Sequence, residues 1–232
     1  EAAGMKVETY PYYDPKTCGL RAADMLATLR TLKPRTPVLL HACCHNPTGV
    51  DLDEGTWKEV VDICAERELI PFVDFAYQGF AEGIVPDSRP IHLLIEKGLT
   101  FFVANSFAKS FSIYRERVVT GSQKEATAVT SQLKRIVRMI YSSPPSYGAQ
   151  LVAIVLTHPE LRPMWENELG EMRERIHEMR HLFAKKLKEV LPDRDFSFIL
   201  NQRGMFSYSG LSVEVMKALR EKYHVYGLDS GR

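Results

Sequence analysis

The first half of the chain contains three apolar runs that begin at Pro37, Leu69 and Thr100 and end in polar or turn-forming residues. Short apolar runs bounded by turn signals are typical of buried β-strands. The stretches between them have helical patterns, and Asp53 or Thr56 can cap the helix that follows the first run. Strands that alternate with helices predict an α/β fold whose sheet is mostly parallel and flanked by helices.

The second half of the chain is dominated by helical periodicity. Residues 124–140 form one amphipathic pattern, and a longer pattern of apolar residues at steps of three and four runs from Met164 to Val190. Pro192 ends this second pattern, because proline cannot continue an α-helix. We therefore predict one long helix in this part of the chain.

Shorter elements follow the long helix. Residues 196–200 and 205–208 alternate as strands do, residues 212–223 have a helical pattern, and residues 224–228 predict a last short strand. This mixture predicts a smaller α+β domain that the long helix joins to the larger one. The two predicted domains are residues 1–153 and residues 154–232.

Chemically versatile side chains follow the three predicted strands. They are Asn46, Asp74, Tyr77, Ser106 and Lys109. Ligands of open parallel sheets bind in the crevice at the carboxyl ends of the strands. We therefore expect these five side chains to share one site.

Lys109 is the most informative of these residues. Lysine readily loses its proton when it is desolvated, and it forms Schiff bases with carbonyl compounds. Ser106 precedes it by three residues and Arg117 follows it by eight, a set that suits a phosphate beside such a Schiff base. The aldehyde cofactor that carries a phosphate is pyridoxal 5'-phosphate (PLP). The alternative is an ordinary surface lysine in a loop.

Seven segments, taken in order, resemble the PLP-dependent aminotransferases of fold type I, and within them the aspartate/aromatic aminotransferase family. The segments are residues 45–49, 74–80, 106–109, 114–117, 138–145, 204–207 and 230–232. They run through nearly the whole chain. The resemblance implies the fold type I architecture, a large PLP-binding domain and a small domain joined by a long helix.

The resemblance also implies roles for the residues that would surround the cofactor ring. Lys109 would form the Schiff base and then move the proton between substrate and cofactor. Asp74 would pair with the pyridinium nitrogen, and Tyr77 and Asn46 would hydrogen-bond the 3'-oxygen. The alternatives are a capping role for Asp74 and a turn role for Asn46.

Three further residues would complete the cofactor site. Ser106 and Arg117 would bind the phosphate, and Arg117 is preferred over Arg115 because the family has the spacing Tyr-x-x-Arg. His41 resembles the family's histidine beneath the ring. The alternative for His41 is a core histidine whose hydrogen bonds are satisfied.

Two arginines would recognise the substrate carboxylates. Arg232 resembles the family's ligand of the α-carboxylate, and Arg138 resembles the ligand of the side-chain carboxylate, which reaches into the other subunit of a homodimer. Arginine suits both roles because its planar fork pairs with a carboxylate through two bonds. The alternatives are an ordinary basic residue in the cationic stretch 134–138 and a chain end with no special role.

Parts of the family's chain are expected to have no counterpart here. These parts are the N-terminal arm, the Ser/Gly phosphate-binding turn, the aromatic residue that stacks on the cofactor, and the final helix of the small domain. A further gap is expected beside Val118 and Val119, where the family continues into a strand. If these gaps are real in the polypeptide, we expect no stable active enzyme.

The composition narrows the class of protein. The chain is 45% hydrophobic and 25% charged with a net charge of +1, which is typical of a globular protein and gives no reason to expect a nucleic-acid or membrane partner. No segment reaches the roughly 18 uninterrupted apolar residues of a membrane span. Four cysteines without a Cys-x-x-Cys spacing favour free thiols in a reducing cytoplasm. His41 and His45 are not on a helix, so no metal site is expected.

The combined interpretation is a cytoplasmic, homodimeric aminotransferase that uses PLP. It would transfer the amino group between aspartate or an aromatic L-amino acid and 2-oxoglutarate in a ping-pong cycle. One alternative is another fold type I enzyme, a lyase or decarboxylase. The other is a truncated relative without catalytic activity that binds a partner through the old dimer surface.

Overall fold

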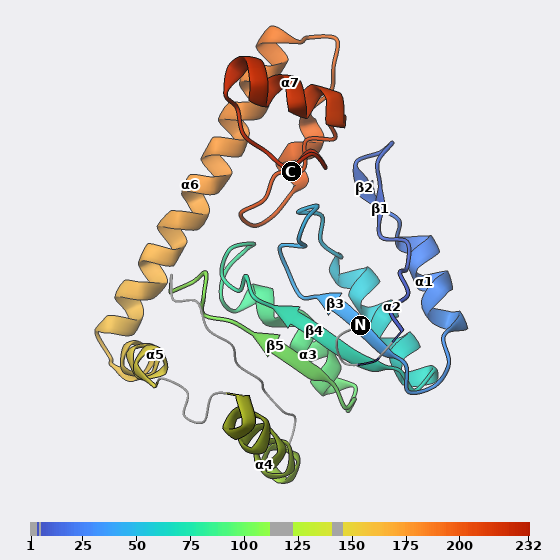
Figure 1. The fold of residues 1–232 in the computed structure, drawn as a ribbon, viewed down its shortest axis with the longest axis vertical. Helices are drawn as coiled ribbons and strands as arrows, with labels where there is room; N and C mark the ends of the chain where they lie inside the picture. The colour runs from blue at the N-terminus through green and yellow to red at the C-terminus, as the bar shows by residue number, and fades with distance from the viewer. Residues whose placement is uncertain (1–3, 5, 112–122, 141–145) are drawn as a thin grey trace.

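The computed structural model describes residue 4 and residues 6–111, 123–140 and 146–232 (Figure 1). Its helices are α1 (Ala22–Thr31), α2 (Glu54–Glu66), α3 (Arg89–Glu96), α4 (Gln123–Ile140), α5 (Tyr147–Thr157), α6 (Leu161–Val190) and α7 (Val213–Tyr223). Its strands are β1 (Tyr13–Asp14), β2 (Gly19–Leu20), β3 (Pro37–His41), β4 (Ile70–Phe75) and β5 (Phe102–Asn105). Two short 3-10 helices are η1 (Pro86–Ser88) and η2 (Ser197–Asn201).

The central sheet consists of three parallel strands in the order β3-β4-β5. Strand pairing places His41 beside Asp74 and Phe75 beside Asn105. The three strands predicted from the sequence are therefore confirmed, and their carboxyl ends meet at one edge of the sheet. The separate β1-β2 hairpin is antiparallel.

One face of the sheet is buried by helices. α2 packs against both α1 and α3, and Figure 1 shows α2 and α3 behind the sheet with α1 at their side. The strand side chains that contribute to the shared core are Val38, Leu40, Val73, Phe75 and Val103. Leu39, Phe72 and Phe102 alternate to the other face and remain 51%, 41% and 40% exposed. This is the period-two alternation that a half-covered sheet requires.

Helix α2 begins as the sequence predicts. The Asp53 carboxylate accepts a hydrogen bond from the Thr56 backbone N–H at 2.7 Å, so Asp53 is the capping residue and Thr56 is not. Trp57, Val60 and Cys64 lie on the buried side of the helix. The capping bond satisfies one N–H of the first turn, and the apolar side chains fix the helix on the sheet.

Helix α6 is a single helix of 30 residues, and it confirms the long helix expected from the apolar periodicity. It contacts α5 near its start and η2 near its end, and so connects the sheet region with the C-terminal region (Figure 1). Helix α7 is also confirmed: the Ser212 hydroxyl accepts a hydrogen bond from Val215 N–H, and His224 ends the helix in a left-handed conformation. The boundary predicted after Ala153 falls within α5 and stays a prediction.

Three predicted strands are wrong. Residues 196–200 lie largely in η2, and residues 205–208 and 224–228 form no strand in the structure. Their backbone groups pair locally instead: Ser197 N–H donates to the Asp195 carboxylate, and Leu228 N–H donates to Arg232 O. An alternating pattern identifies a half-buried backbone, but a strand also needs a neighbouring strand to pair with.

No helix within the described residues is long and apolar enough to cross a membrane.

Candidate active site

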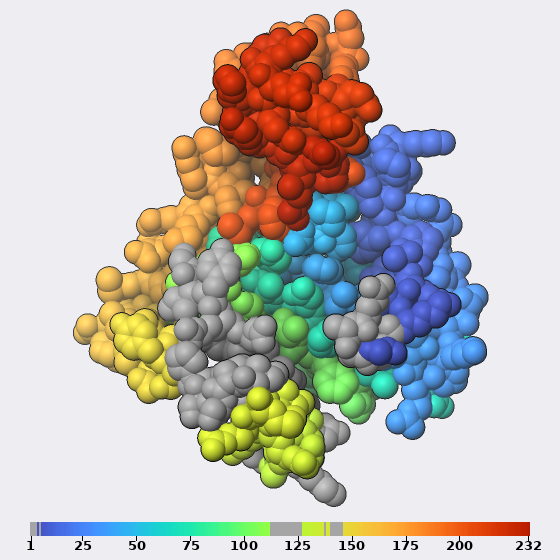
Figure 2. All heavy atoms as spheres, viewed as in Figure 1, coloured from blue at the N-terminus to red at the C-terminus, as the bar shows by residue number. Residues whose placement is uncertain are grey.

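The site lies where the carboxyl edge of the sheet meets the C-terminal region. Arg232 donates from Nη1 to the Asn46 side-chain oxygen at 2.5 Å, which joins the last residue of the chain to the turn after β3. Figure 2 shows the C-terminal residues, in red, above the cyan residues of this turn. The Asn46–Pro47 peptide bond in this turn is cis. Two residues that the sequence assigned to one site are therefore in direct contact.

Tyr77 and Lys109 belong to the same group of side chains. The Lys109 amine lies 5.7 Å from the centre of the Tyr77 ring. Burial and the charge of Asp74 raise the pKa of Tyr77, while Arg232 and a hydrogen bond with Asn46 partly offset that rise. Tyr77 consequently keeps its phenolic proton at neutral pH and can donate it to an anionic oxygen.

Asp74 occupies the end of β4, beside His41 of β3. One of its carboxylate oxygens accepts a hydrogen bond from the Ala76 N–H at 3.1 Å, which orients the carboxylate at the strand end. Asp74 also raises the pKa values of both neighbours, His41 and Tyr77. Asp74 therefore places a carboxylate at the strand end, near both side chains, and its pairing with a cofactor nitrogen stays a prediction.

Ser106 and Lys109 lie in the turn after β5. The Ser106 hydroxyl oxygen accepts a hydrogen bond from Ala108 N–H at 3.1 Å, which fixes the side chain against the turn. A hydroxyl that accepts one hydrogen bond still has its own proton to donate. Ser106 is thus held at the same turn as Lys109 and keeps a donor that an anion can use.

His41 and His45 form an aromatic cluster beneath the site. Their rings meet edge to face at 4.7 Å, and His45 stacks on Tyr12 at 3.9 Å. His41 Nδ1 is buried and has no hydrogen-bond partner among the described residues, and the role of His41 beneath a cofactor ring stays a prediction. Burial lowers the pKa of His41, and Asp74 offsets part of that effect. Both histidines are consequently neutral at pH 7.

Burial, and secondarily the charge of His41, lowers the pKa of His45 to about 3. Between the ordinary value of 6.5 and this value, the unfolded chain binds a proton that the folded chain does not. We expect the free energy of unfolding to fall as pH falls through this window, with His45 contributing up to about 1.4 kcal/mol per pH unit.

Denaturant unfolding between pH 7 and pH 4 checks this expectation. His45→Gln should make the pH dependence shallower, and the same change at the exposed His92 should leave it as it is. Equal slopes for the wild type and His45→Gln would contradict the assignment.

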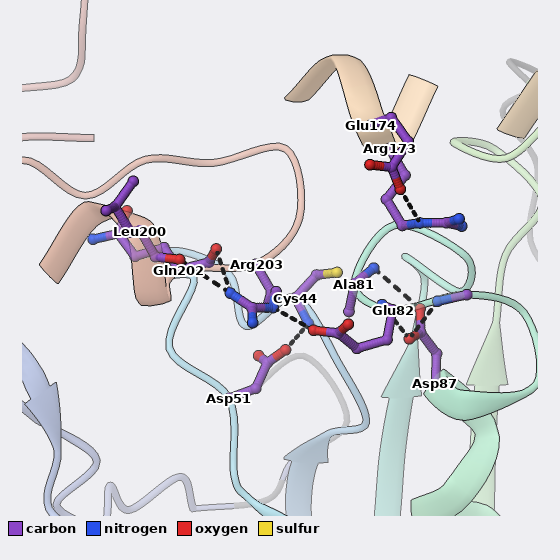
Figure 3. Close-up of polar contacts among 11 residues, drawn as sticks. Cys44, Asp51, Ala81, Glu82, Asp87, Arg173, Glu174, Leu200, Gln202 and Arg203 are labelled. Carbon is purple, nitrogen blue, oxygen red and sulfur yellow. Dashed lines mark hydrogen bonds and ion pairs between the residues drawn. The ribbon is translucent and has the colours of Figure 1, made fainter. Parts of the chain in front are cut away.

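Two carboxylates, the half-buried Asp51 and the buried Asp87, hold the turns that carry the site, and the sequence analysis missed both. Asp51 accepts hydrogen bonds from the N–H groups of Cys44 and His45, each at 2.7 Å. Burial raises the pKa of Asp51, and those two bonds counteract part of the rise. Asp87 accepts from four backbone N–H groups in the turn after β4 (Figure 3). Asp51 follows Asn-Pro-Thr-Gly by two residues, a position typical of an aspartate that closes a turn.

The C-terminal region is tied to both turns by Arg203 (Figure 3). Its guanidinium pairs with the Glu82 carboxylate at 2.6 Å, and its backbone N–H donates to Gly49 O at 2.7 Å. A Cβ atom at Gly49 would lie 2.9 Å from Gln202 Cβ, so a larger residue there would push the regions apart. These contacts bring Arg232 to the strand ends.

The structure does not add two further predicted site residues to this group. Arg117 lies outside the described residues. Arg138 is exposed on α4, and Figure 1 shows α4 well away from the ends of the strands. Within the described residues, no group of three His, Cys, Asp or Glu side chains is placed to hold a metal ion.

The chain has a parallel α/β sheet with a lysine, an aspartate and a tyrosine at the carboxyl edge. It matches known proteins throughout its length. Residues 1–231 match the model of the family described as aminotransferase class I and II. The chain belongs to this family.

Individual aminotransferases match the chain over 99% or 100% of its length. The chain is 48% identical over its whole length to an aspartate aminotransferase of Pseudomonas aeruginosa and covers 60% of that protein. It is 50% identical, over 99% of its length, to an aromatic-amino-acid aminotransferase of Escherichia coli and covers 59% of it. Among solved structures, an aromatic-amino-acid aminotransferase of Burkholderia pseudomallei covalently bound to pyridoxal phosphate matches 99% of the chain and 59% of its own, with a TM-score of 0.93 and 51% identity. The predicted fold type I architecture is thereby confirmed.

Proposed function

We propose that this chain forms the site of a PLP-dependent aminotransferase that acts on L-aspartate or an aromatic L-amino acid, with 2-oxoglutarate as acceptor. The observation that carries the proposal is the cluster at the strand ends, where Lys109 faces Tyr77 and Arg232 contacts Asn46. The names of the similar proteins support the reaction class. The chain spans about 60% of the length of those proteins, so activity and substrates are proposed for the protein as a whole.

The residues present fit the cofactor. The orphaned Nδ1 of His41 lies in a buried position beside Asp74, so this part of the site has hydrogen-bonding capacity that the chain itself does not satisfy. Lys109 would hold the cofactor covalently, and Asp74 would pair with its ring nitrogen. Tyr77 and Asn46 would donate to its 3'-oxygen, and the phosphate would be bound by Ser106 and Arg117. Bound PLP supplies an electron sink for a substrate carbanion.

Lys109, Asp74 and Tyr77 then have separate tasks in the proposed reaction. Once the substrate amine has displaced it, the freed Lys109 amine would take the proton from the substrate Cα, since it stands at a fixed turn beside the ring site. The Asp74 carboxylate keeps the opposing nitrogen protonated, because a negative charge favours the protonated form of its partner. Tyr77 keeps its phenolic proton and stabilises developing negative charge on the 3'-oxygen.

Arg232 would bind the α-carboxylate shared by the amino-acid donor and the 2-oxo acid acceptor. Both substrates would therefore use the same arginine in turn, as a ping-pong cycle requires. Arg138 would bind the second carboxylate of aspartate and 2-oxoglutarate from the other subunit of a homodimer. Its exposed position on α4 is compatible with such a role. The four cysteines are free thiols, and we propose the cytoplasm as the compartment.

Arg138→Leu should lower kcat/KM for L-aspartate by about 100-fold or more, because the second carboxylate loses its charged partner. Turnover of L-phenylalanine should change little, since that substrate has no second carboxylate. Arg135→Leu, on the same helix, is the matched control and should leave both substrates unaffected. Equal losses on the two substrates would refute the role of Arg138 and favour a lyase or decarboxylase.

Borohydride reduction of the PLP-incubated protein, followed by peptide mapping, tests the function directly. A pyridoxyl adduct on Lys109 is the expected result, because only a lysine inside a formed site should react with high occupancy. Scattered labelling of surface lysines would contradict the proposal and support a relative without catalytic activity.

A further inference from the structure

Arg180 is an arginine buried in α6, with 5% of its surface exposed. It donates from Nη2 to two backbone carbonyl oxygens, Gly204 O at 2.5 Å and Phe206 O at 2.7 Å. Its Nε and Nη1 are buried and have no hydrogen-bond partner among the described residues, and burial lowers its pKa. A buried guanidinium with unsatisfied donors is costly, so helix packing alone does not explain it.

The turn at residues 204–206, which Arg180 holds, is contacted on its other side by the turn that follows β3. Gly204 has φ +81, and a Cβ atom there would collide with the Cys44 side chain. Cys44 is itself fixed, since its backbone N–H donates to Asp51. The turn at residues 204–206 is therefore held between α6 and the strand edge, and its position is defined from both sides.

Phe206 connects this turn to the site through contacts of its ring. Its ring lies 4.6 Å from the Arg232 guanidinium carbon, and its edge-to-face partner is Tyr77 at 5.7 Å. A guanidinium over an aromatic face is attracted electrostatically, so the ring defines where the arginine rests. The ring thus stands between the proposed α-carboxylate ligand and the proposed 3'-oxygen donor.

We propose that Arg180 is a positioning residue for the substrate carboxylate: it fixes the backbone at Phe206, and the Phe206 ring aligns Arg232 toward Asn46. The inference rests on the proposed function, in which Arg232 binds the α-carboxylate. Misplacement of Arg232 would weaken carboxylate binding and spare the rest of the ligand.

Helix α6 offers a matched control for this role. Arg173 lies two turns before Arg180 and also donates to a backbone carbonyl, Gly79 O at 3.2 Å. Its partner belongs to the turn after β4 and is not one of the residues that contact Arg232. Arg173→Met and Arg180→Met remove the same kind of bond from the same helix, and only the second should affect carboxylate recognition.

The test is calorimetric binding of 3-indolepropionate and its neutral amide to the PLP-loaded protein. The acid has one carboxylate, equivalent to the α-carboxylate, and the amide has none. We expect wild-type protein to prefer the acid, Arg180→Met to lose about tenfold of that preference, and Arg173→Met to retain it. Phe206→Leu should lose a similar share, and the double variant Arg180→Met/Phe206→Leu should lose little more than either alone.

The outcomes distinguish a failure of the proposed α-carboxylate role of Arg232 from a failure of the role of Arg180. If the wild type binds acid and amide equally, the α-carboxylate role and the inference fall together. If the wild type prefers the acid and folded Arg180→Met keeps that preference, the inference is wrong and the proposed function stands. If Arg180→Met does not fold, the two single variants Arg180→Lys, which keeps a charged donor, and Phe206→Leu take its place. An undiminished preference for the acid in both variants would equally overturn the inference.

Discussion

Lys109→Ala is expected to lower the transamination rate by about 10⁴-fold or more, because the change removes both the covalent attachment and the proton-transferring amine. Single-turnover kinetics with L-aspartate measure this loss. The noncovalent contacts of Asp74, Asn46 and Tyr77 remain in the variant, so PLP should still bind, more weakly. The expected signature is bound cofactor without turnover.

Lys97→Ala is the control for this change. Lys97 is an exposed lysine whose amine pairs with the Asp62 carboxylate at 2.7 Å, and its loss should leave the rate unaffected. Lys109→Arg keeps a positive charge but has no amine that can bond to an aldehyde, so it should be as inactive as the alanine variant. Substantial activity in either Lys109 variant would end the assignment of Lys109.

Arg232→Leu is expected to lower kcat/KM by about 10³-fold for aspartate and aromatic donors alike. The change removes the proposed charged partner of the α-carboxylate and leaves the Asn46 oxygen without the donor that now lies at 2.5 Å. Since every amino-acid substrate has an α-carboxylate, the loss should not discriminate between donors, unlike the loss in Arg138→Leu. Steady-state kinetics with both donors measure it.

Arg220→Leu serves as the comparison, because Arg220 is another arginine of the C-terminal region and pairs with Asp229 instead of Asn46. It should affect stability more than kcat/KM. A donor-specific loss in Arg232→Leu would show that Arg232 binds the side chain of the substrate and not its α-carboxylate.

The strands and the long helix could be predicted because their patterns are local. The apolar runs of β3, β4 and β5 are bounded by turn residues, and α6 has apolar residues at a helical period over its whole length. The residues at the strand ends followed from the parallel topology, since such strands bring their carboxyl ends together. The assignment of Arg232 to this site followed only from the family resemblance, and its contact with Asn46 was not predicted.

The rest depends on contacts that no local pattern encodes. The β1-β2 hairpin has two residues per strand, too few to produce a period. Residues 196–200 alternate like a strand but have no neighbour to pair with, so they curl into η2. Arg180 lies in a helix full of charged residues, and nothing in its sequence distinguishes it from the exposed arginines beside it.

The contact between Gly79 and Leu169 has a mechanical consequence. Gly79 has φ +92, and a Cβ atom there would collide with the Leu169 side chain, so α6 rests directly on the backbone of the turn after β4. Arg180 lies eleven residues, or about 16 Å, further along this helix. A wedge that tilted α6 by about 5° would move Arg180 by about 1.4 Å, more than a well-formed hydrogen bond tolerates. Because Gly79 has no Cβ atom, α6 can pack at the depth at which Arg180 reaches its two carbonyl partners. A side chain at residue 79 would therefore disturb the alignment proposed for Arg232.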